Sequence, residues 1–335
     1  MIVPRYFRTQ EWWEPKLAPI LSIGLLTIHV YAFESAAYGM GFLFFLFVSL
    51  GIGASYVSLI NDFTDLEEDL KAGKSNRLLG VSKSKQRLLI SATLVGILIA
   101  IYILLPFVEG LLLFLGALLV YTLYSVPPFR LKNRGGWGVL ADSLGAHAFP
   151  SMGIFAILSQ FMIESVDWMV LLLIGTWSLF YGLRGILGHQ YSDLENDESV
   201  GLNTFATRFP IDKMRQMEWP ILLVEQLALI GLLVYFKIGL LLLLLTLYYG
   251  YVLLLRWKRN VPFVIILHPP QPDWNILMAT YYQVLLPIGL LGMLGMYHSW
   301  VYLLIPVFVL IFPNDILRNS ALVTSLFHSK EIPEA

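Results

Sequence analysis

The segment NDFTDLEEDLKAGKSNRL, residues 61–78, directly follows an apolar stretch at 40–60. Five acidic residues and an asparagine lie within its first nine positions, and three basic residues follow in the next eight. The apolar stretch has about the length of a helix that crosses a bilayer. We therefore expect a dense group of charges at the membrane surface, where a spanning helix ends.

The composition of the whole chain supports a membrane protein. It has 335 residues, of which 57% are hydrophobic and 13% charged, and its mean hydropathy is +0.71. A soluble domain carries about 25% charged residues. The net charge of −1 argues against a nucleic-acid partner. The absence of cysteine excludes disulfides, iron–sulfur clusters and thiolate zinc sites.

The apolar segments predict an all-α, polytopic membrane bundle of about nine transmembrane helices in a single domain, residues 1–335. A tenth segment, interrupted by Pro306 and Pro313, is expected either to span or to form a re-entrant or interfacial helix. The ten segments lie at about 17–33, 40–60, 88–105, 110–125, 139–159, 168–189, 219–236, 238–255, 276–296 and 300–317.

A second acidic loop, HQYSDLENDESVGLNTF at 189–205, indicates an internal repeat. Asp62 and Asp193 each follow the second helix of a four-helix group. Such duplicated bundles often place a site at the interface of the repeats. We therefore expect two four-helix repeats around a central cavity. The predicted halves are about 17–135 and 138–256, with extra C-terminal helices at 274–317.

The distribution of basic residues predicts the orientation. Links after even-numbered segments are rich in Lys and Arg, whereas links after odd-numbered segments are acidic or nearly neutral. Cytoplasmic loops carry an excess of basic residues. Both acidic loops are therefore expected on the cytoplasmic side. The basic links are 71–87, 130–134, 208–215 and 256–259.

The acidic residues have the spacing of a metal site. If the second span continues as helix, Asp62, Asp65 and Asp69 share one face, and so do Asp193 and Asp197. Mg²⁺ prefers oxygen ligands and is often bound by one or two carboxylates together with substrate phosphates. A diphosphate bridging the two clusters is the expected ligand. The alternative is solvated loop charge, which two equivalent loops on one side disfavour.

The chain resembles the UbiA superfamily of membrane-embedded prenyltransferases. The first and last of four matching segments resemble its two aspartate motifs, although Leu78 stands where the superfamily usually has proline. The resemblance spans about residues 15–300. The segments, in the order of the superfamily, are NDFTDLEED (61–69), NRLLG (76–80), YSVPPFRLK (124–132) and DLEND (193–197).

The resemblance implies that an isoprenyl diphosphate binds through Mg²⁺, that its C–O bond ionises, and that an acceptor captures the allylic cation. The five aspartates would hold the metal, and basic residues would touch phosphate, although positive-inside topology alone also explains those basic residues. The implied catalytic residues are Asp62, Asp65, Asp193, Asp197, Arg130 and Lys132, and Asp69 completes the metal set. The implied substrate-binding residues are Asn61, Lys71, Arg77, Tyr124, His189 and Gln190.

Several functions share these motifs. The leading hypothesis is a prenyltransferase, and the main alternative is a UbiA-type terpene cyclase, which needs no external acceptor. Transfer from a sugar diphosphate to a polyprenyl phosphate is a further variant. A transporter is disfavoured because the acidic clusters lie at the membrane rim rather than at the midplane. The acceptor stays open between aromatic and lipid molecules, and membrane lipids are expected to surround the bundle.

Four other polar residues have sequence-based interpretations. Arg184, within the sixth span, is expected to be paired because isolated charges in membranes are costly, and helix geometry favours Glu195 as its partner. Glu225, in the seventh span, would either line the cavity or tie helices together. Asp142 is interpreted as an acid that complements a helix dipole. Lys16, beside two tryptophans, is interpreted as part of an interfacial anchor.

Overall fold

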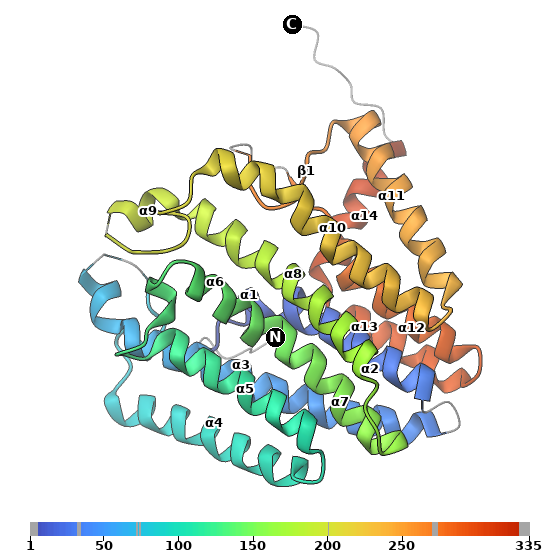
Figure 1. Ribbon diagram of the computed structural model, residues 1–335, viewed down its shortest axis with the longest axis horizontal. Coiled ribbons are helices and arrows are strands. Elements are labelled where there is room, and N and C mark those ends of the chain that lie inside the picture. Colours follow the sequence, from blue (N-terminus) through green and yellow to red (C-terminus); the bar gives the residue numbers. More distant parts are fainter. Residues whose placement is uncertain are drawn as a thin grey trace, which may run out of the picture.

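A computed structural model describes residues 6–31, 35–71, 73, 75–199, 201–269 and 274–327. The predicted all-α fold is confirmed, because most of these residues are helical (Figure 1). The N-terminal half contains α1 (Thr9–Trp12), the π-helix η1 (Trp13–Leu17), α2 (Ala18–Tyr31), α3 (Ala36–Lys71), α4 (Lys83–Leu104), α5 (Val108–Ser125) and the 3₁₀ turn η3 (Leu131–Asn133).

The rest of the chain continues the bundle. A short parallel strand pair, β1 with β2, joins the last long helix to the C-terminal helices. The elements are α6 (Gly136–Ser143), η4 (Leu144–Ala148), α7 (Phe149–Ile163), α8 (Trp168–Ser192), α9 (Leu194–Ser199), α10 (Ile211–Tyr235), α11 (Gly239–Arg259), β1 (Phe263–Val264), β2 (Asn275–Ile276), η5 (Tyr281–Leu285), α12 (Leu286–Gly295), η6 (Ser299–Leu303), α13 (Leu304–Ile311) and α14 (Asn314–Phe327).

The number of membrane spans differs from the count of apolar segments. Seven helices of the described residues are long and apolar enough to cross a membrane, or eight if the bent pair Ser299–Ile311 and Asn314–Phe327 is one span. The expected count of nine is therefore not confirmed. Two of the predicted segments form only short regular helices, α2 with 14 residues and Tyr281–Gly295.

The tenth predicted segment is broken. The helices Ser299–Ile311 and Asn314–Phe327, which meet within this segment, are bent by 87° relative to each other. Phe312 leaves the helical conformation, with φ −124° and ψ 67°. The residue before a proline is disfavoured in the helical region, and Pro313 cannot donate to the helix. The proline in the sequence therefore marks the break.

Helix α2 is largely buried, and it lies between α7 and α12. Ile23, Leu25 and Ile28 on it are at most 2% exposed. A helix that is apolar on all sides belongs in the interior of a bundle. By contrast, α4 lies at one edge and packs mainly against α3 (Figure 1).

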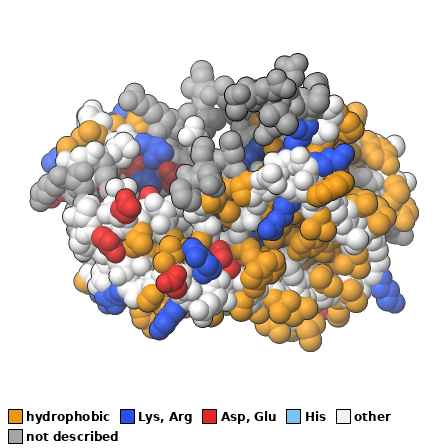
Figure 2. All heavy atoms as spheres, turned by 90° about the horizontal axis from the view of Figure 1, so that it is seen from above, with side chains coloured by type: hydrophobic (Ala, Val, Ile, Leu, Met, Phe, Trp, Pro, Cys, Tyr) orange, Lys and Arg blue, Asp and Glu red, His pale blue; other side chains and the backbone are white. Residues whose placement is uncertain are grey.

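Large apolar side chains are exposed on the long helices. Leucines such as Leu98, Leu112 and Leu253 are more than 60% exposed on long helices, as expected of side chains that face lipid. Figure 2 shows a face on which Asp and Glu side chains gather in one half, hydrophobic side chains cover much of the other half, and Lys and Arg side chains occur in both. In Figure 1, α9 and the C-terminal end of α3 lie at the same end of the bundle.

Candidate functional site

A cavity of about 870 Å³ opens between the two acidic segments. Its polar end is formed by the end of α3, the η3 turn and the α8–α9 junction, and its walls are apolar. The polar lining includes Arg8, Glu11, Lys16, Ser58, Asn61, Asp65, Asp69, Tyr121, Tyr124, Ser125, Arg130, Lys132, Asp142, His189, Gln190, Asp193, Asn196 and Asp197. The apolar lining includes Leu17, Ile20, Leu50, Val57, Phe114, Ala117, Leu118 and Ile186.

The first acidic segment continues α3 as predicted, up to Lys71. Asp65 and Asp69 line the cavity. Asp62 is fully buried beside it, and Arg8 Nε donates to its Oδ1 at 2.8 Å. The other oxygen, Oδ2, is buried without a hydrogen-bond partner in the part of the chain that the structure describes. The three acids therefore share one helix face but have different environments.

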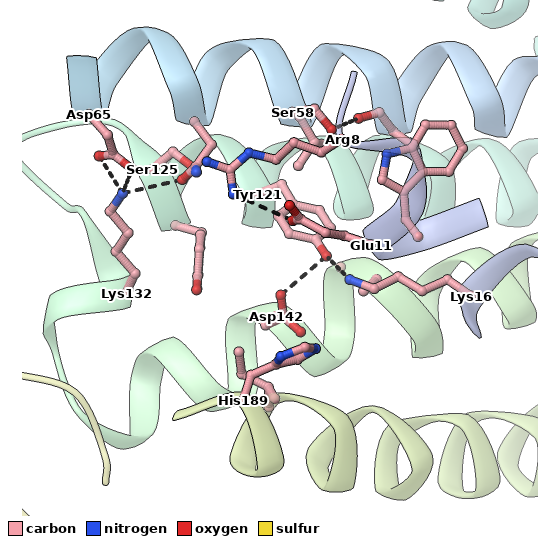
Figure 3. Close-up of a pocket in the computed structure, with 18 of the residues that line it drawn as sticks. Arg8, Glu11, Lys16, Ser58, Asp65, Tyr121, Ser125, Lys132, Asp142 and His189 are labelled. Atoms are coloured by element: carbon pink, nitrogen blue, oxygen red, sulfur yellow. Dashed lines mark hydrogen bonds and ion pairs between the residues drawn. The ribbon is translucent and has the colours of Figure 1, made fainter. Parts of the chain in front are cut away.

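The turn after α5 carries two cations, Arg130 and Lys132, onto this face. Figure 3 shows Lys132 beside Asp65. The helix ends at Ser125, and Val126 is extended because a proline follows it. Arg130 donates to Asp65 Oδ1 at 2.8 Å, and Lys132 Nζ contacts both Asp65 oxygens. Lys132 also donates to Asn61 Oδ1 at 3.2 Å. The chain after α5 therefore returns over the cavity mouth.

Basic side chains also compensate the unfavourable position of the carboxylates at the end of α3. Carboxylates at the C-terminal end of a helix are unfavourable, because the negative end of the macrodipole lies there. Burial opposes the charge of Arg8, but its hydrogen bond and charge interaction with Asp62 raise the pKa of Arg8 overall. Arg8, Arg130 and Lys132 offset the charge of the acids, so that the cluster can remain close together.

The second acidic segment interrupts α8. Asp193 follows the last helical residue of α8, and α9 begins at the next position. Asp193 and Asp197 both line the cavity together with Asn196. Gln190 accepts hydrogen bonds through Oε1 from the backbone N–H of Phe205, at 3.0 Å, and of Ala206. Gln190 therefore fixes the loop after α9 in addition to lining the cavity.

His189 lines the cavity from the last turn of α8. Nearby, His268 Nδ1 lies 2.6 Å from Ser192 Oγ, and its ring stacks on that of Trp274. Burial and then the neighbouring His189 lower the pKa of His268. The segment between β1 and β2 thus packs against the α8 end of the site.

Two predicted residues, Asp62 and Arg77, are not among the cavity-lining residues in the described part of the chain. Arg77 Nη2 forms an ion pair with Glu11 at 3.2 Å, which joins the loop after α3 to the N-terminal segment. The side chain of Lys71 lies outside the described part of the structure. Asp69 accepts a hydrogen bond from Asn76 Nδ2 at 2.8 Å, so the loop after α3 is held against the acidic face.

The prediction for Arg184 is wrong in its partner. Arg184 is buried and donates to Glu225 at 2.7 Å, not to Glu195. It also donates to the carbonyl oxygens of Ile265 and Leu277. Helix periodicity identifies neighbours along α8, whereas the real partner comes from α10. The pair ties α8, α10 and the β1–β2 region together, so Glu225 links helices and does not line the cavity.

Sequence reasoning missed the N-terminal segment. Arg8 and Glu11 reach the cavity, and no motif marks them. Lys16 lies at the start of a predicted span, and its side chain points into the cavity (Figure 3). Asp142 also faces the cavity, from within α6. A helix-dipole role does not explain that orientation.

The comparisons with known proteins agree with this architecture. Residues 20–263, more than half of the chain, match the model of the UbiA prenyltransferase family. The chain belongs to the UbiA prenyltransferase family. It is accordingly an integral membrane protein with the fold of a prenyltransferase-type enzyme. None of the curated proteins compared with the sequence matches it.

Solved UbiA structures show the same fold. A UbiA homologue from Archaeoglobus fulgidus bound to GPP and Mg²⁺ has a TM-score of 0.54 and 16% identity, covering 90% of this chain and 98% of that one. The same homologue bound to DMAPP and Mg²⁺ gives the same values. Its Cd²⁺-bound form has a TM-score of 0.51 and 17% identity, covering 90% and 100%.

The oxygen atoms that line the cavity of this UbiA chain are suitable ligands for a hard cation. In the described residues no group of three or more His, Cys, Asp and Glu side chains is close enough to hold a metal by itself. The cavity nevertheless offers carboxylate and amide oxygens on two sides, and the buried Oδ2 of Asp62 lacks a partner in the described residues. Mg²⁺ needs only one or two carboxylates when phosphates complete its shell. The residues therefore fit Mg²⁺ bound together with a diphosphate.

Proposed function

We propose that this chain is an intramembrane, Mg²⁺-dependent prenyltransferase that ionises an isoprenyl diphosphate and transfers the prenyl group to a small or lipophilic acceptor. The observation that carries the proposal is the arrangement of the cavity. Two acidic segments and two cations share its polar end, and apolar walls continue from them. A charged diphosphate and an apolar chain need this combination.

The metal set of this proposal comprises Asp62, Asp65, Asp69, Asp193 and Asp197. Bound Mg²⁺ would neutralise negative charge on the diphosphate as the leaving group departs. Arg130 and Lys132 lie on Asp65, between the two acidic segments, and would bind phosphate oxygens from the mouth of the cavity. Asn61 would hold Lys132 in place through the 3.2 Å hydrogen bond.

The apolar wall suits the prenyl chain. On α5, the cavity-lining residues run from Ser125 at the polar end to Phe114. These positions are eleven residues apart and therefore about 16 Å apart along a helix. Tyr124 lies at the polar end of this wall. A dry wall around the reacting carbon would protect an allylic cation from capture by water.

The relatives support the donor class. The Archaeoglobus homologue binds GPP and DMAPP together with Mg²⁺. We extend the isoprenyl diphosphate class to this chain because its cavity joins oxygen ligands, phosphate-binding cations and an apolar wall. We also propose that the acidic segments face the cytoplasm, because the basic links of the sequence lie on their side of the spans.

Product analysis tests the proposal. Purified protein with Mg²⁺ and labelled GPP, without an acceptor, should release diphosphate slowly and form only the alcohol that results when water captures the prenyl cation. Addition of a suitable acceptor should divert the label into a prenylated product, identified by mass. A cyclised hydrocarbon formed without an acceptor would instead favour the terpene cyclase. Failure to release diphosphate from any isoprenyl diphosphate would contradict both.

A further inference from the structure

A second polar group lines the same cavity. Lys16 Nζ donates to the Tyr121 hydroxyl at 3.5 Å, and the Tyr121 hydroxyl donates to Asp142 Oδ1 at 3.3 Å (Figure 3). All three residues line the cavity. We call them the Lys16 group. Neither diphosphate binding nor the metal set uses any of its members.

The chain fixes Lys16 toward the cavity from several sides. Lys16 belongs to the π-helix η1, and π-helical turns often occur at functional sites. The hydroxyl of Tyr181 donates to the carbonyl of Pro15 at 3.0 Å, and Trp13 Nε1 donates to Ile311 at 2.8 Å. The Glu14 carboxylate accepts from the first backbone N–H groups of α14. A residue kept only as an interfacial anchor would not need this scaffold.

Tyr121 is held equally closely. A Cβ atom built on Gly145 would lie 2.8 Å from Cδ2 of the Tyr121 ring. Any larger side chain at Gly145 would therefore displace the ring. On α5, Tyr121 lies one helical turn from Ser125, which donates to Asn61 at 3.2 Å. The Lys16 group is thus about one turn deeper in the cavity than the polar residues at the mouth.

The charges of the Lys16 group are only partly satisfied. Within the described residues, the sole hydrogen-bond partner of the Lys16 ammonium is Tyr121, at the long distance of 3.5 Å. An ammonium group has three donors. Asp142 likewise receives one long hydrogen bond in that part of the chain. Charges inside a membrane bundle are costly and tend to be functional. The pair offers a cation and a carboxylate on either side of one hydroxyl.

We propose that the Lys16 group is the acceptor subsite, and that it takes a lipophilic acceptor with a hydroxyl group, an alcohol or a phenol. The ligand oxygen would accept from Lys16 while its O–H donates to Asp142. This inference rests on the proposed transferase function and narrows its acceptor class. Asp142 would be a catalytic residue, and Tyr121 would position both charges.

The proposed prenyl transfer needs no further reactant besides the isoprenyl diphosphate, the acceptor and the Asp142 carboxylate. The C–O bond between the prenyl carbon and the diphosphate breaks, and both electrons leave with the diphosphate. A lone pair of the acceptor oxygen, or a π pair of the ring of a phenol, forms the new bond to that carbon. The proton lost from O–H, or from the ring carbon, passes to the Asp142 carboxylate. General-base assistance of this kind contributes about 10²–10⁴-fold.

Three acceptors of equal chain length test the class: an alkylphenol, the primary alcohol and the carboxylic acid. The assay follows purified full-length protein with Mg²⁺ and labelled GPP, and it reports the ratio of prenylated acceptor to diphosphate released. The wild type should prenylate the alkylphenol or the alcohol in preference to the acid. Asp142→Asn should lower that ratio by at least about 100-fold.

The Lys16 variants test recognition separately. Lys16→Met should raise the acceptor KM at least about tenfold, and Lys16→Arg should restore most of the affinity. Lys83→Met is the matched control, because Lys83 is exposed at the start of α4 and does not line the cavity. It should leave both readouts unchanged. Gly145→Ala should resemble Tyr121→Phe, because both disturb the bridging hydroxyl.

Diphosphate release separates this inference from the proposed function. Absence of diphosphate release in the wild type would refute the transferase proposal itself. Three results would overturn the acceptor subsite while leaving donor ionisation intact. The first is diphosphate release with no prenylation of any probe, and the second is prenylation of the acid alone. The third is an unchanged ratio of prenylated acceptor to diphosphate in Asp142→Asn and Lys16→Met.

Discussion

Replacement of Arg130 by Lys separates phosphate binding from membrane topology. The substitution keeps the positive charge, and therefore the basic link, but removes the planar fork that binds two phosphate oxygens at once. Arg130 has φ 38°, in the left-handed region. Lys carries the same Cβ constraint there, so the backbone should not change. Lys132 already places a compact ammonium on Asp65. A second ammonium at position 130 would not replace the fork.

The magnitude follows from the lost donor. Removing one preorganised donor to developing negative charge costs about 2–4 kcal/mol of transition-state stabilisation. This corresponds to a fall of about 30- to several-hundred-fold in kcat/KM. Because the guanidinium donates to Asp65 at 2.8 Å and is mostly buried, bulk water will not substitute for it fully.

The assay measures diphosphate release at saturating Mg²⁺ over a range of GPP concentrations. Arg134→Lys is the matched control, because Arg134 is exposed and donates to the carbonyl of Pro128 at 2.8 Å, away from the acids. The control should stay within about twofold of the wild type. Equal, near-wild-type kcat/KM in both variants would show that Arg130 serves only topology.

Two further predictions concern stability and orientation. Arg184→Met should destabilise the protein by about 3–5 kcal/mol, because it leaves the buried Glu225 carboxylate unpaired. Thermal unfolding in detergent should show this loss of stability in Arg184→Met. The double variant Arg184→Met, Glu225→Leu should recover much of it, and a double variant as unstable as the single one would argue against the Arg184–Glu225 ion pair. Single cysteines at Ser75 and Ser199 should react with impermeant thiol reagents only after cells are permeabilised. Labelling of either cysteine in intact cells would contradict the cytoplasmic orientation.

The sequence predicts the local structure of the acidic and basic motifs well, because it depends on residues close to them in the chain. Helix periodicity placed Asp62, Asp65 and Asp69 on one face, and α3 continues far enough to realise it. The double proline at 127–128 likewise explains locally why α5 ends at Ser125 and the chain turns back to bring Arg130 to the cavity mouth. In each case the signal lies within a few residues of the feature that it controls.

The parts that the sequence did not predict depend on contacts between distant segments. Lys16 points into the cavity because the segment before it is fixed on Asn314, about 300 positions away along the chain. Arg184 pairs with α10 because of how two helices pack. Hydropathy also cannot distinguish a long span from a short buried helix, and α2 is such a helix. Apolar length therefore gave more spans than the structure confirms.

We propose that the two acidic segments would hold the Mg²⁺ that neutralises the diphosphate as the prenyl C–O bond breaks. The most direct measurement is the Mg²⁺ dependence of diphosphate release from labelled GPP. Asp65→Asn and Asp193→Asn are compared with Glu195→Gln and Glu198→Gln, whose acids are exposed on α9 and do not line the cavity. We predict release that stops in EDTA, falls at least about 100-fold in both aspartate variants and persists in both glutamate variants. Release that continues in EDTA, or that is equal in all four variants, would contradict the account.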